Sequence, residues 1–266
     1  MSILDKFALT DKVAVITGAG KGIGAEIARV FASAGADVVL AARTESDLKA
    51  VAAEIEAMGR RALTVVTDVL DFDQLQALAD QTMAEFGRID ILVNNAGGAP
   101  PKPVSRTSAK EFEAAFRFNV STAFEMSRLC APLIVESAGD GVILNISSVA
   151  GQYPAPCFSS YGTAKAGLSF LTKELAQEYA PKIRVNAIAV GSTKTDALNS
   201  VLNEEIEQTM VELTPMARLG EVEDIALGAL YLCSPAASYV TGDVLGVNGG
   251  LERLNMQMPR AFGGQG

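Results

Sequence analysis

The sequence predicts one α/β domain in which a doubly wound, mostly parallel sheet of about seven strands carries helices on both faces. Three observations predict it. Short aliphatic or β-branched runs alternate with longer amphipathic segments, a glycine-rich turn follows the first run, and 266 residues with 49% hydrophobic content are enough for one core. Because no repeat, low-complexity segment or linker interrupts residues 1–266, we expect a single domain.

The expected strands follow one another along the chain at residues 13–16, 38–40, 63–66, 89–93, 142–146, 183–188 and 244–247. Apolar residues at helical spacing over 23–34 predict the first helix, which stops at Gly35. A charged helix ends near Gly59, and a long helix precedes the fifth strand. Right-handed crossovers between such strands place the ligand crevice at their carboxyl ends. Residues 251–266 are expected to form a ragged tail with a disordered end at 263–266.

Composition narrows the possible partners. A net charge of −9 and a pI of about 4.7 argue against nucleic acid and anionic membranes, which both favour a basic face. Cys130, Cys157 and Cys233 lack paired or metal-binding spacing, so we expect reduced thiols and no metal site. The N-terminus lacks a long apolar run, and no apolar stretch reaches about 20 residues. These features predict a cytoplasmic protein.

The glycine-rich turn has the spacing G-x-x-x-G-x-G and contains Gly18, Lys21, Gly22, Ile23 and Gly24. Between a strand and a helix, such a turn lets backbone N–H groups approach a pyrophosphate at the positive end of the helix. Glycine turns before helices are common, and this spacing is not the usual G-x-G-x-x-G. Its place after the first strand of a βαβ unit is what predicts a dinucleotide site.

The end of the second strand favours NADP(H) over NAD(H). Enzymes that use NAD place an acid there, whereas this chain has Ala42 followed by Arg43, which can pair with a 2′-phosphate. Lys21 would be a second cation, and the alternative is that Arg43 is a solvated charge. Asp68 and Val69 follow the third strand and could contact the adenine, although an aspartate there is as often a helix cap.

A proton-transfer set follows in the second half of the chain. Tyr161 and Lys165 are four residues apart, so a helix places them on one face. A phenol titrates near 10, and a nearby ammonium would lower that pKa. Ser148, at the end of the fifth strand, could orient a carbonyl oxygen, and Asn119 could hold a water for a relay through Lys165. In a chain without histidine, this set predicts an oxidoreductase.

Together these residues resemble the short-chain dehydrogenase/reductase family over residues 10–250. The motifs are the turn at residues 17–24, Asn94-Asn95-Ala96-Gly97, Asn119, Ser148 and Tyr161-x-x-x-Lys165. The resemblance implies a Rossmann-like fold, Tyr161 as acid/base, Ser148 as orienter, Asn119 as the fourth member of the set, and a Lys165 that also bonds the nicotinamide ribose. It also implies cofactor contacts from Asn95, Ala96, Gly97, Gly191, Thr193 and Thr195. The family's Pro-Gly is Val190-Gly191 here, which leaves the geometry of that loop open.

Within the family, residues 97–103 and 195–208 look like bacterial 7α-hydroxysteroid dehydrogenases, and the likeness to 3-oxoacyl-[acyl carrier protein] reductases is similar in extent. Apolar residues at helical spacing over 198–213 predict an amphipathic helix, either a lid within about 192–215 or a packing helix. Tyr153, Cys157 and Phe158 are expected to line the pocket, with Met256 and Met258 near its mouth. Their apolar character favours a bulky hydrophobic alcohol or ketone.

Several alternatives stay open. A thioester reductase would need a basic patch for an acidic carrier protein, and Arg106, Lys110, Arg117 and Arg128 are spread over several faces. A non-catalytic NADP(H)-binding sensor or scaffold is a second class, and an isomerase or lyase a third. The helices at residues 119–132 and 159–179 carry more apolar surface than one sheet face covers, which predicts a homotetramer.

Overall fold

Seven parallel strands form one sheet in the order β3-β2-β1-β4-β5-β6-β7. The structure is a computed structural model, and it describes residues 2–199, 202–258 and 260. The strands are β1 (Val13–Thr17), β2 (Asp37–Ala42), β3 (Ala62–Val66), β4 (Ile91–Asn94), β5 (Gly141–Ser148), β6 (Ile183–Val190) and β7 (Val244–Val247). The order reverses between β1 and β4, so the predicted doubly wound fold is confirmed, with its crevice beyond their carboxyl ends.

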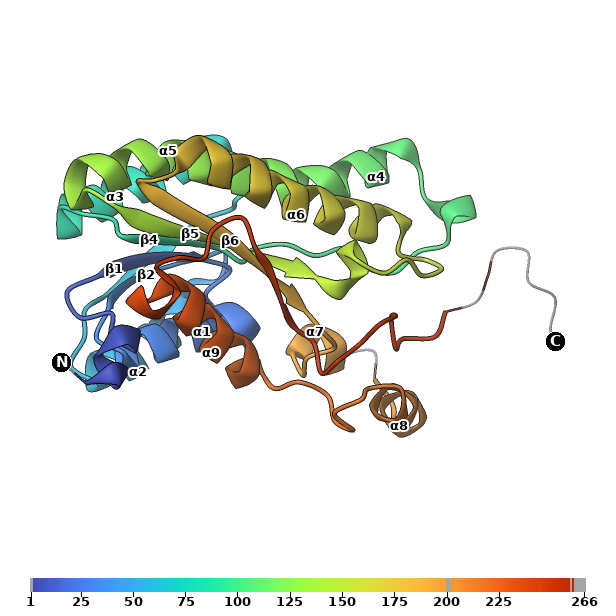
Figure 1. Cartoon of the computed structure of the whole chain (residues 1–266). Coiled ribbons are helices and arrows are strands. Elements are labelled where there is room, and N and C mark those ends of the chain that lie inside the picture. The colour runs from blue at the N-terminus through green and yellow to red at the C-terminus, as the bar shows by residue number, and fades with distance from the viewer. Residues whose placement is uncertain (1, 200–201, 259, 261–266) are drawn as a thin grey trace.

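Two layers of helices cover the sheet (Figure 1). One contains α1 (Gly22–Ser33), α2 (Glu45–Ala57) and α9 (Val222–Cys233). The other contains α3 (Phe72–Phe86), α4 (Ala109–Phe116), α5 (Thr122–Ala138) and α6 (Ser159–Tyr179). A buried apolar cluster lies under each layer, around Ile27 and Phe31 on one face and around Leu75 and Ile134 on the other. Both faces of the sheet are therefore rigidly supported, which fixes the strand ends that carry the site.

The long helix expected before the fifth strand is interrupted. Between α4 and α5 the chain forms one π-helical turn, η3 (Arg117–Ser121), and Asn119 lies within it. Such turns change which way a side chain points without ending the helix. Among the described residues no helix is both long and apolar enough to cross a membrane.

The single amphipathic helix expected over residues 198–213 is wrong. The structure has two short helices, α7 (Asp196–Asn199) and α8 (Glu204–Glu212). Asn203 lies between them, and its side chain accepts a hydrogen bond from the Ile206 N–H at 2.8 Å. This capping bond, with acids in the first turn, starts a new helix at Glu204. Residues 200–201, and the expected disordered end at 263–266, lie outside the described residues.

Candidate active site

The glycine-rich turn connects β1 to α1 in a conformation that its glycines permit. Gly18 and Gly22 have φ values of 66° and 57°, in the left-handed region that side chains disfavour. A Cβ on Gly24 would lie 2.3 Å from the Gly18 carbonyl oxygen. Lys21 precedes α1, and its side chain makes no capping hydrogen bond. The first N–H groups of α1 therefore lack a side-chain cap and lie in a turn of closely packed glycine backbone, a cradle that suits a pyrophosphate.

A buried hydroxyl and an amide hold this turn in place. Thr17 Oγ1 accepts hydrogen bonds from the N–H groups of Asn95 and Ala96, both at 3.1 Å. The Asn95 amide donates to the carbonyls of Thr17 at 2.9 Å and Gly18 at 3.1 Å. Asn95 thus supports the turn through its side chain, and Thr17, which the sequence analysis gave only as part of the motif at residues 17–24, is a structural member of the site. A polar residue in the otherwise apolar run of β1 is the signal that marks Thr17.

The charged residues of the predicted cofactor site lie around the end of β2. Arg43 is exposed just after the strand, and no hydrogen bond or ion pair engages its guanidinium within the described part of the chain. Lys21 Nζ lies 3.9 Å from Asp47 Oδ2 at the start of α2, in an exposed pair. Asp68 Oδ1 accepts a hydrogen bond from the Leu70 N–H at 3.0 Å, while Asp71 caps α3. Asp68 is therefore a turn former rather than the helix cap itself, and Val69 next to it is buried.

The loop after β6 forms the opposite wall of the crevice. Val190 pairs with Ser148 on one side and Val247 on the other, and the Gly191 N–H donates to the Val247 carbonyl at 3.0 Å. The strand therefore runs through Val190 without interruption. Gly191 itself is needed, because a Cβ there would lie 2.6 Å from the Asn248 Cα.

Two threonines follow in this loop. Thr193 Oγ1 donates to the Gly191 carbonyl at 3.2 Å, so its hydroxyl is engaged by its own loop. Thr195 Oγ1 accepts from the Leu198 N–H at 3.3 Å, at the start of α7. The Thr195 methyl carbon lies 3.7 Å from the position that a Cβ of Gly22 would occupy. The loop therefore closes against the glycine-rich turn, which brings both predicted cofactor segments together.

Ser148 and Tyr161 meet at the end of β5. The Ser148 Oγ accepts a hydrogen bond from the Ala150 N–H at 3.1 Å, which leaves its own proton free to donate. A hydrogen bond from Ser148 lowers the pKa of the Tyr161 phenol, but burial has the larger effect and raises that pKa overall. The predicted pair is thus brought together in the structure.

Two glycines that sequence reasoning missed allow this approach. A Cβ on Gly151 would lie 2.7 Å from the backbone of α6 at Lys165 and Ala166, and one on Gly162 would lie 2.7 Å from the Ala150 carbonyl oxygen. The first turn of α6 therefore rests directly on the turn after Ser148. In the sequence these are isolated glycines, and only their proximity in three dimensions shows their function.

Lys165 is 4% exposed on the inner face of α6. Its Nζ donates to the Ile146 carbonyl at 2.7 Å and lies 5.8 Å from the centre of the Tyr161 ring. Burial lowers the pKa of Lys165 to about 8. The expected lowering of the Tyr161 pKa by this ammonium is not what the structure shows: burial dominates, and the ammonium bonds a strand carbonyl instead of the phenol.

Asn119 is 1% exposed and reaches the same place from the π-helical turn. Its Oδ1 accepts from the Gly98 N–H at 2.8 Å, and its Nδ2 donates to the carbonyls of Ala115 at 2.8 Å and Gly98 at 3.0 Å. A Cβ on Gly97 would lie 2.7 Å from Asn119 Oδ1 and 3.1 Å from Lys165 Nζ. Gly97 therefore lets the amide and the ammonium converge beside it, as a relay between them would require.

The residues just before α6 form a tight wall. Cys157 is buried with a φ of 68°, and its carbonyl accepts from the Lys102 N–H at 2.8 Å. This bond joins the loop after β4 to the loop after β5. The Phe158 and Tyr161 rings lie 6.4 Å apart, and Tyr153 and Phe158 are half-buried. An aromatic edge thus borders Tyr161. Cys130 and Cys233 are buried too, which raises the pKa of each thiol to about 12, and none of the three cysteines forms a disulfide within the described part of the chain.

Comparisons with known proteins agree with this geometry. Residues 18–252 match a family model described as enoyl-(acyl carrier protein) reductase. The chain is 49% identical over 97% of its length to an uncharacterised oxidoreductase of Mycobacterium tuberculosis, and 46% identical over 94% to 7α-hydroxysteroid dehydrogenase of Escherichia coli K12. Each match covers 98% of the relative. The 3-oxoacyl-[acyl-carrier-protein] reductase of Thermotoga maritima is 35% identical over 91% of this chain and 98% of its own.

A solved structure shows the same fold. It is a 7α-hydroxysteroid dehydrogenase complexed with NADH and 7-oxo glycochenodeoxycholic acid, with a TM-score of 0.90 at 45% identity over 94% of this chain and 98% of its own. The chain therefore belongs to the short-chain dehydrogenase/reductase family, and it is an oxidoreductase that acts on CH–OH groups. The predicted resemblance is confirmed, and identity is higher to the steroid enzyme than to the thioester reductase.

Proposed function

We propose that the protein is an NADP(H)-dependent oxidoreductase that interconverts a bulky, hydrophobic secondary alcohol and its ketone. The observation that carries this proposal is the convergence of Ser148, Tyr161 and Lys165 at the end of β5, beside the glycine cradle of α1. A bound nicotinamide would supply or accept the hydride. The cradle fits its pyrophosphate, because the N–H groups at the start of α1 carry no side-chain cap.

The protein's own residues would manage the substrate oxygen. In the direction of reduction, the Ser148 hydroxyl holds the carbonyl oxygen, and the Tyr161 phenol donates its proton to that oxygen as the alcohol forms. Burial raises the pKa of the Tyr161 phenol, so the phenol is protonated at neutral pH, which is the form that reduction requires, and the same shift makes it a weaker acid. The Lys165 ammonium bonds the Ile146 carbonyl and not the phenol, so it would act on the developing phenolate only through space, from 5.8 Å to the centre of the ring. Asn119 and Lys165 would then return a proton through a water beside Gly97.

The preference for NADP(H) rests on Arg43. Its exposed guanidinium follows β2, where it could bond a 2′-phosphate in a bidentate manner. Lys21 can contribute as well, because its 3.9 Å pair with Asp47 is exposed and such pairs are weak. The related steroid enzyme was solved with NADH, so the preference of this chain for NADP(H) depends on the proposed contact of Arg43.

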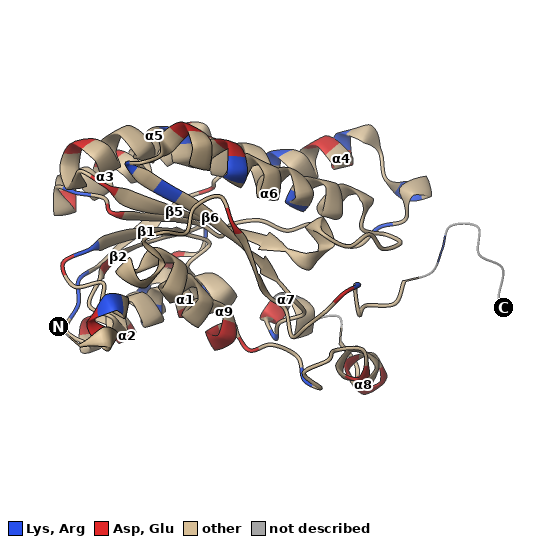
Figure 2. Cartoon of the chain, in the orientation of Figure 1, with Lys and Arg blue, Asp and Glu red and all other residues tan. Residues whose placement is uncertain are grey.

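The steroid-like substrate class is favoured by the pocket wall and by the relatives. Cys157, Phe158 and Tyr153 offer an apolar border beside Tyr161. Two of the basic residues that a carrier protein would need already bond other groups of the chain. Arg128 pairs with Glu125, and Arg117 donates to the Leu70 carbonyl and lies over the Phe72 ring. Lys and Arg alternate with Asp and Glu over α4, α5 and α6 (Figure 2). A 3-oxoacyl thioester is therefore the second candidate.

A homotetramer and a cytoplasmic location remain part of the proposal. Four phenylalanines on α4, α5 and α6 are between 38% and 63% exposed, namely Phe112, Phe116, Phe124 and Phe170. Exposed phenylalanines on these packed helices favour an interface, and a two-fold contact would bury them against their own copies.

The test measures NADPH and NADH oxidation with an oxosteroid, an acetoacetyl thioester and a compact diketone. Oxidation of NADPH with the oxosteroid supports the proposal, whereas turnover of the thioester alone would replace its substrate class. Tyr161→Phe should abolish turnover while NADPH still binds, and Tyr179→Phe on the same helix is the matched control. Silence with all compounds would favour a binding-only sensor, and product formed without net NADPH consumption would favour an isomerase or lyase.

A further inference from the structure

Asn255 lies in the segment after β7, and its side chain is 2% exposed. Its Oδ1 accepts a hydrogen bond from Ser192 Oγ at 2.6 Å. Its Nδ2 donates to the Met210 carbonyl at 3.1 Å and to Thr214 Oγ1 at 2.9 Å. One amide therefore joins the loop after β6, the end of α8 and the C-terminal segment, which are far apart in the sequence.

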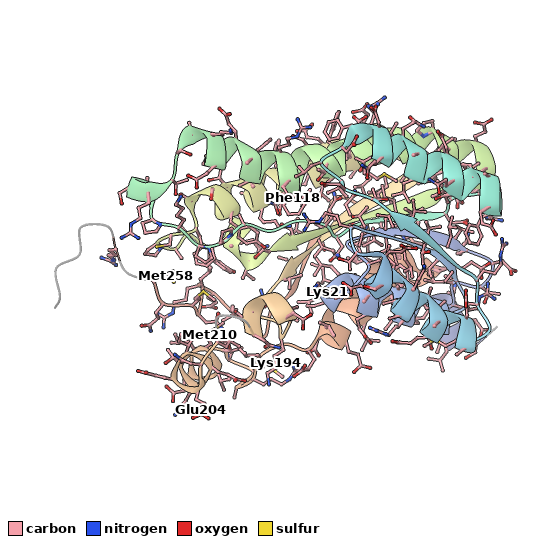
Figure 3. The ribbon with its side chains drawn as sticks, turned by 180° about the vertical axis from the view of Figure 1, so that it is seen from behind. Lys21, Phe118, Lys194, Glu204, Met210 and Met258 are labelled. Atoms are coloured by element: carbon pink, nitrogen blue, oxygen red, sulfur yellow. The ribbon has the colours of Figure 1, made fainter. Side chains whose placement is uncertain are left out.

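These bonds hold the end of α8. Met210 is the one residue of this helix that is fully buried, at 1% exposure. Thr214 Oγ1 also donates to the Met210 carbonyl at 2.7 Å, so Asn255 completes a closed set of bonds there. A second link, from Lys194 Nζ to Glu207 Oε1 at 3.3 Å, is exposed and therefore weak. Figure 3 shows Glu204, Met210 and Met258 at one end of the molecule, with Lys194 between them and Lys21.

The chain beyond α8 faces a cavity on one side and is tied to its neighbours by backbone hydrogen bonds, from the Met216 N–H to the Gly249 carbonyl at 3.1 Å and from the Gly220 N–H to the Ser192 carbonyl at 2.9 Å. Thr214, Met216 and Arg218 line a cavity of about 270 Å³, and Ser192 and Asn248 line it from the sheet side. A segment that faces a cavity lacks the close contacts that fix a packed core. Directed hydrogen bonds therefore contribute to where α8 lies relative to the loop after β6, and the Asn255 amide joins the two directly through Ser192 and the Met210 carbonyl.

We propose that Asn255 is a positioning residue that seats α8 against the loop formed by residues 191–195 and so sets the width of the substrate crevice. This rests on the proposed function and on the family resemblance, which implies that Gly191, Thr193 and Thr195 contact the dinucleotide. Ser192 lies between those contacts and bonds Asn255 directly. A dinucleotide that orders the loop therefore also steadies α8, and the coupling between them requires the Asn255 amide.

The first test is limited proteolysis with endoproteinase Glu-C, followed by mass spectrometry of cleavage at Glu204, Glu205, Glu207 and Glu212. Local opening controls such cleavage. For Asn255→Ala we expect cleavage in α8 roughly tenfold faster than in the wild type, and loss of the protection that NADPH gives. The matched control is Asn186→Ala. Asn186 is also fully buried, and bonds the Val240 carbonyl and the Asp243 N–H, so its loss should lower the unfolding temperature without selective cleavage in α8.

The second variant, Asn255→Asp, separates positioning from general stability. A carboxylate cannot donate to the Met210 carbonyl, whereas a protonated carboxyl can. A protonated carboxyl restores one of the two bonds that the Asn255 amide donates, so cleavage of this variant should approach the wild-type rate at acidic pH and rise to the Asn255→Ala rate once the carboxyl ionises. Burial would move that step above about pH 3.9. Cleavage must be compared with that of wild type at each pH, because the protease has its own pH profile.

Wild-type cleavage rates in both Asn255 variants at every pH would overturn the proposal, as would faster cleavage that Asn186→Ala reproduces. Because the digestion requires no turnover, its result is independent of the enzymatic assay. If NADPH leaves wild-type cleavage unchanged, the coupling to the dinucleotide is refuted. A protein that is inactive with every ketone yet shows the expected cleavage and protection would refute the proposed reaction and support the role of Asn255.

Discussion

Replacing Lys165 with methionine should abolish turnover and yet stabilise the ligand-free protein. The side chain is 4% exposed, and burial lowers its pKa from the ordinary 10.5 to about 8. A lowered pKa means that the fold disfavours the charged form, which is nevertheless the main form at neutral pH. Methionine has a similar length and carries no charge, so Lys165→Met removes the buried ammonium with little change in packing.

The magnitude follows from the two pKa values. The gap between 10.5 and about 8 corresponds to about 3.4 kcal/mol at 1.36 kcal/mol per pKa unit. The variant also loses the 2.7 Å hydrogen bond to the Ile146 carbonyl, which costs about 1 kcal/mol. We therefore expect the free energy of unfolding to rise by about 2 kcal/mol at pH 7.

The advantage of the variant should depend on pH in a defined direction. Below pH 8 the lysine is charged in both the folded and the unfolded wild type, so the folded state carries the whole cost. Between pH 8 and 10.5 the folded state loses its proton first, and the wild type gains stability relative to the variant. At pH 9.5 the difference should shrink to a few tenths of a kcal/mol, on the order of the measurement error.

Urea unfolding of the ligand-free protein at pH 7 and pH 9.5 measures both values. Lys173→Met is the matched control, because Lys173 is exposed on the same helix. It should change the free energy of unfolding little at either pH. A Lys165→Met protein that is less stable than the wild type at pH 7, or an advantage that does not change with pH, would refute the argument that burial of this ammonium is costly.

Three further outcomes follow from the structure. Arg43→Ala should weaken NADPH binding roughly 10- to 100-fold, because a charge-assisted contact is lost, and should affect NADH binding little. Lys49→Ala, which removes an exposed cation of α2, is the control. Equal losses of NADPH and NADH affinity in fluorescence titrations would refute the role of Arg43. Phe170→Glu should break the proposed tetramer into smaller species in light scattering, whereas an unchanged mass would exclude this face as an interface. Gly151→Ala should lower kcat/KM roughly 100-fold while the circular dichroism spectrum stays that of the wild type. The new Cβ, 2.7 Å from the backbone of α6, would displace Tyr161 and Lys165. Wild-type kinetics would contradict this.

The sequence alone could predict the relative positions of those site residues that lie on regular strands and helices. Ser148 ends β5, and Tyr161 and Lys165 share one face of α6, so strand ends and helical spacing are sufficient to bring them together. The break before Glu204 was not predictable from apolar spacing, because the capping bond of Asn203 to Ile206 overrides a pattern that continues through it. The raised pKa of Tyr161 also escaped prediction, since burial depends on the whole fold.

Chemistry and substrate choice depend on different kinds of structure in this protein. Ser148, Tyr161 and Lys165 are held by a strand, a helix and close glycine contacts, which leave little room for movement. The proposed substrate side instead includes α8 and the loop after β6, which are joined by the amide of Asn255. Changes near Asn255 can therefore alter which ketone fits without moving the proton-transfer groups. On this reasoning, substrate differences among relatives with the same Ser-Tyr-Lys set should be sought first in the segments that Asn255 connects.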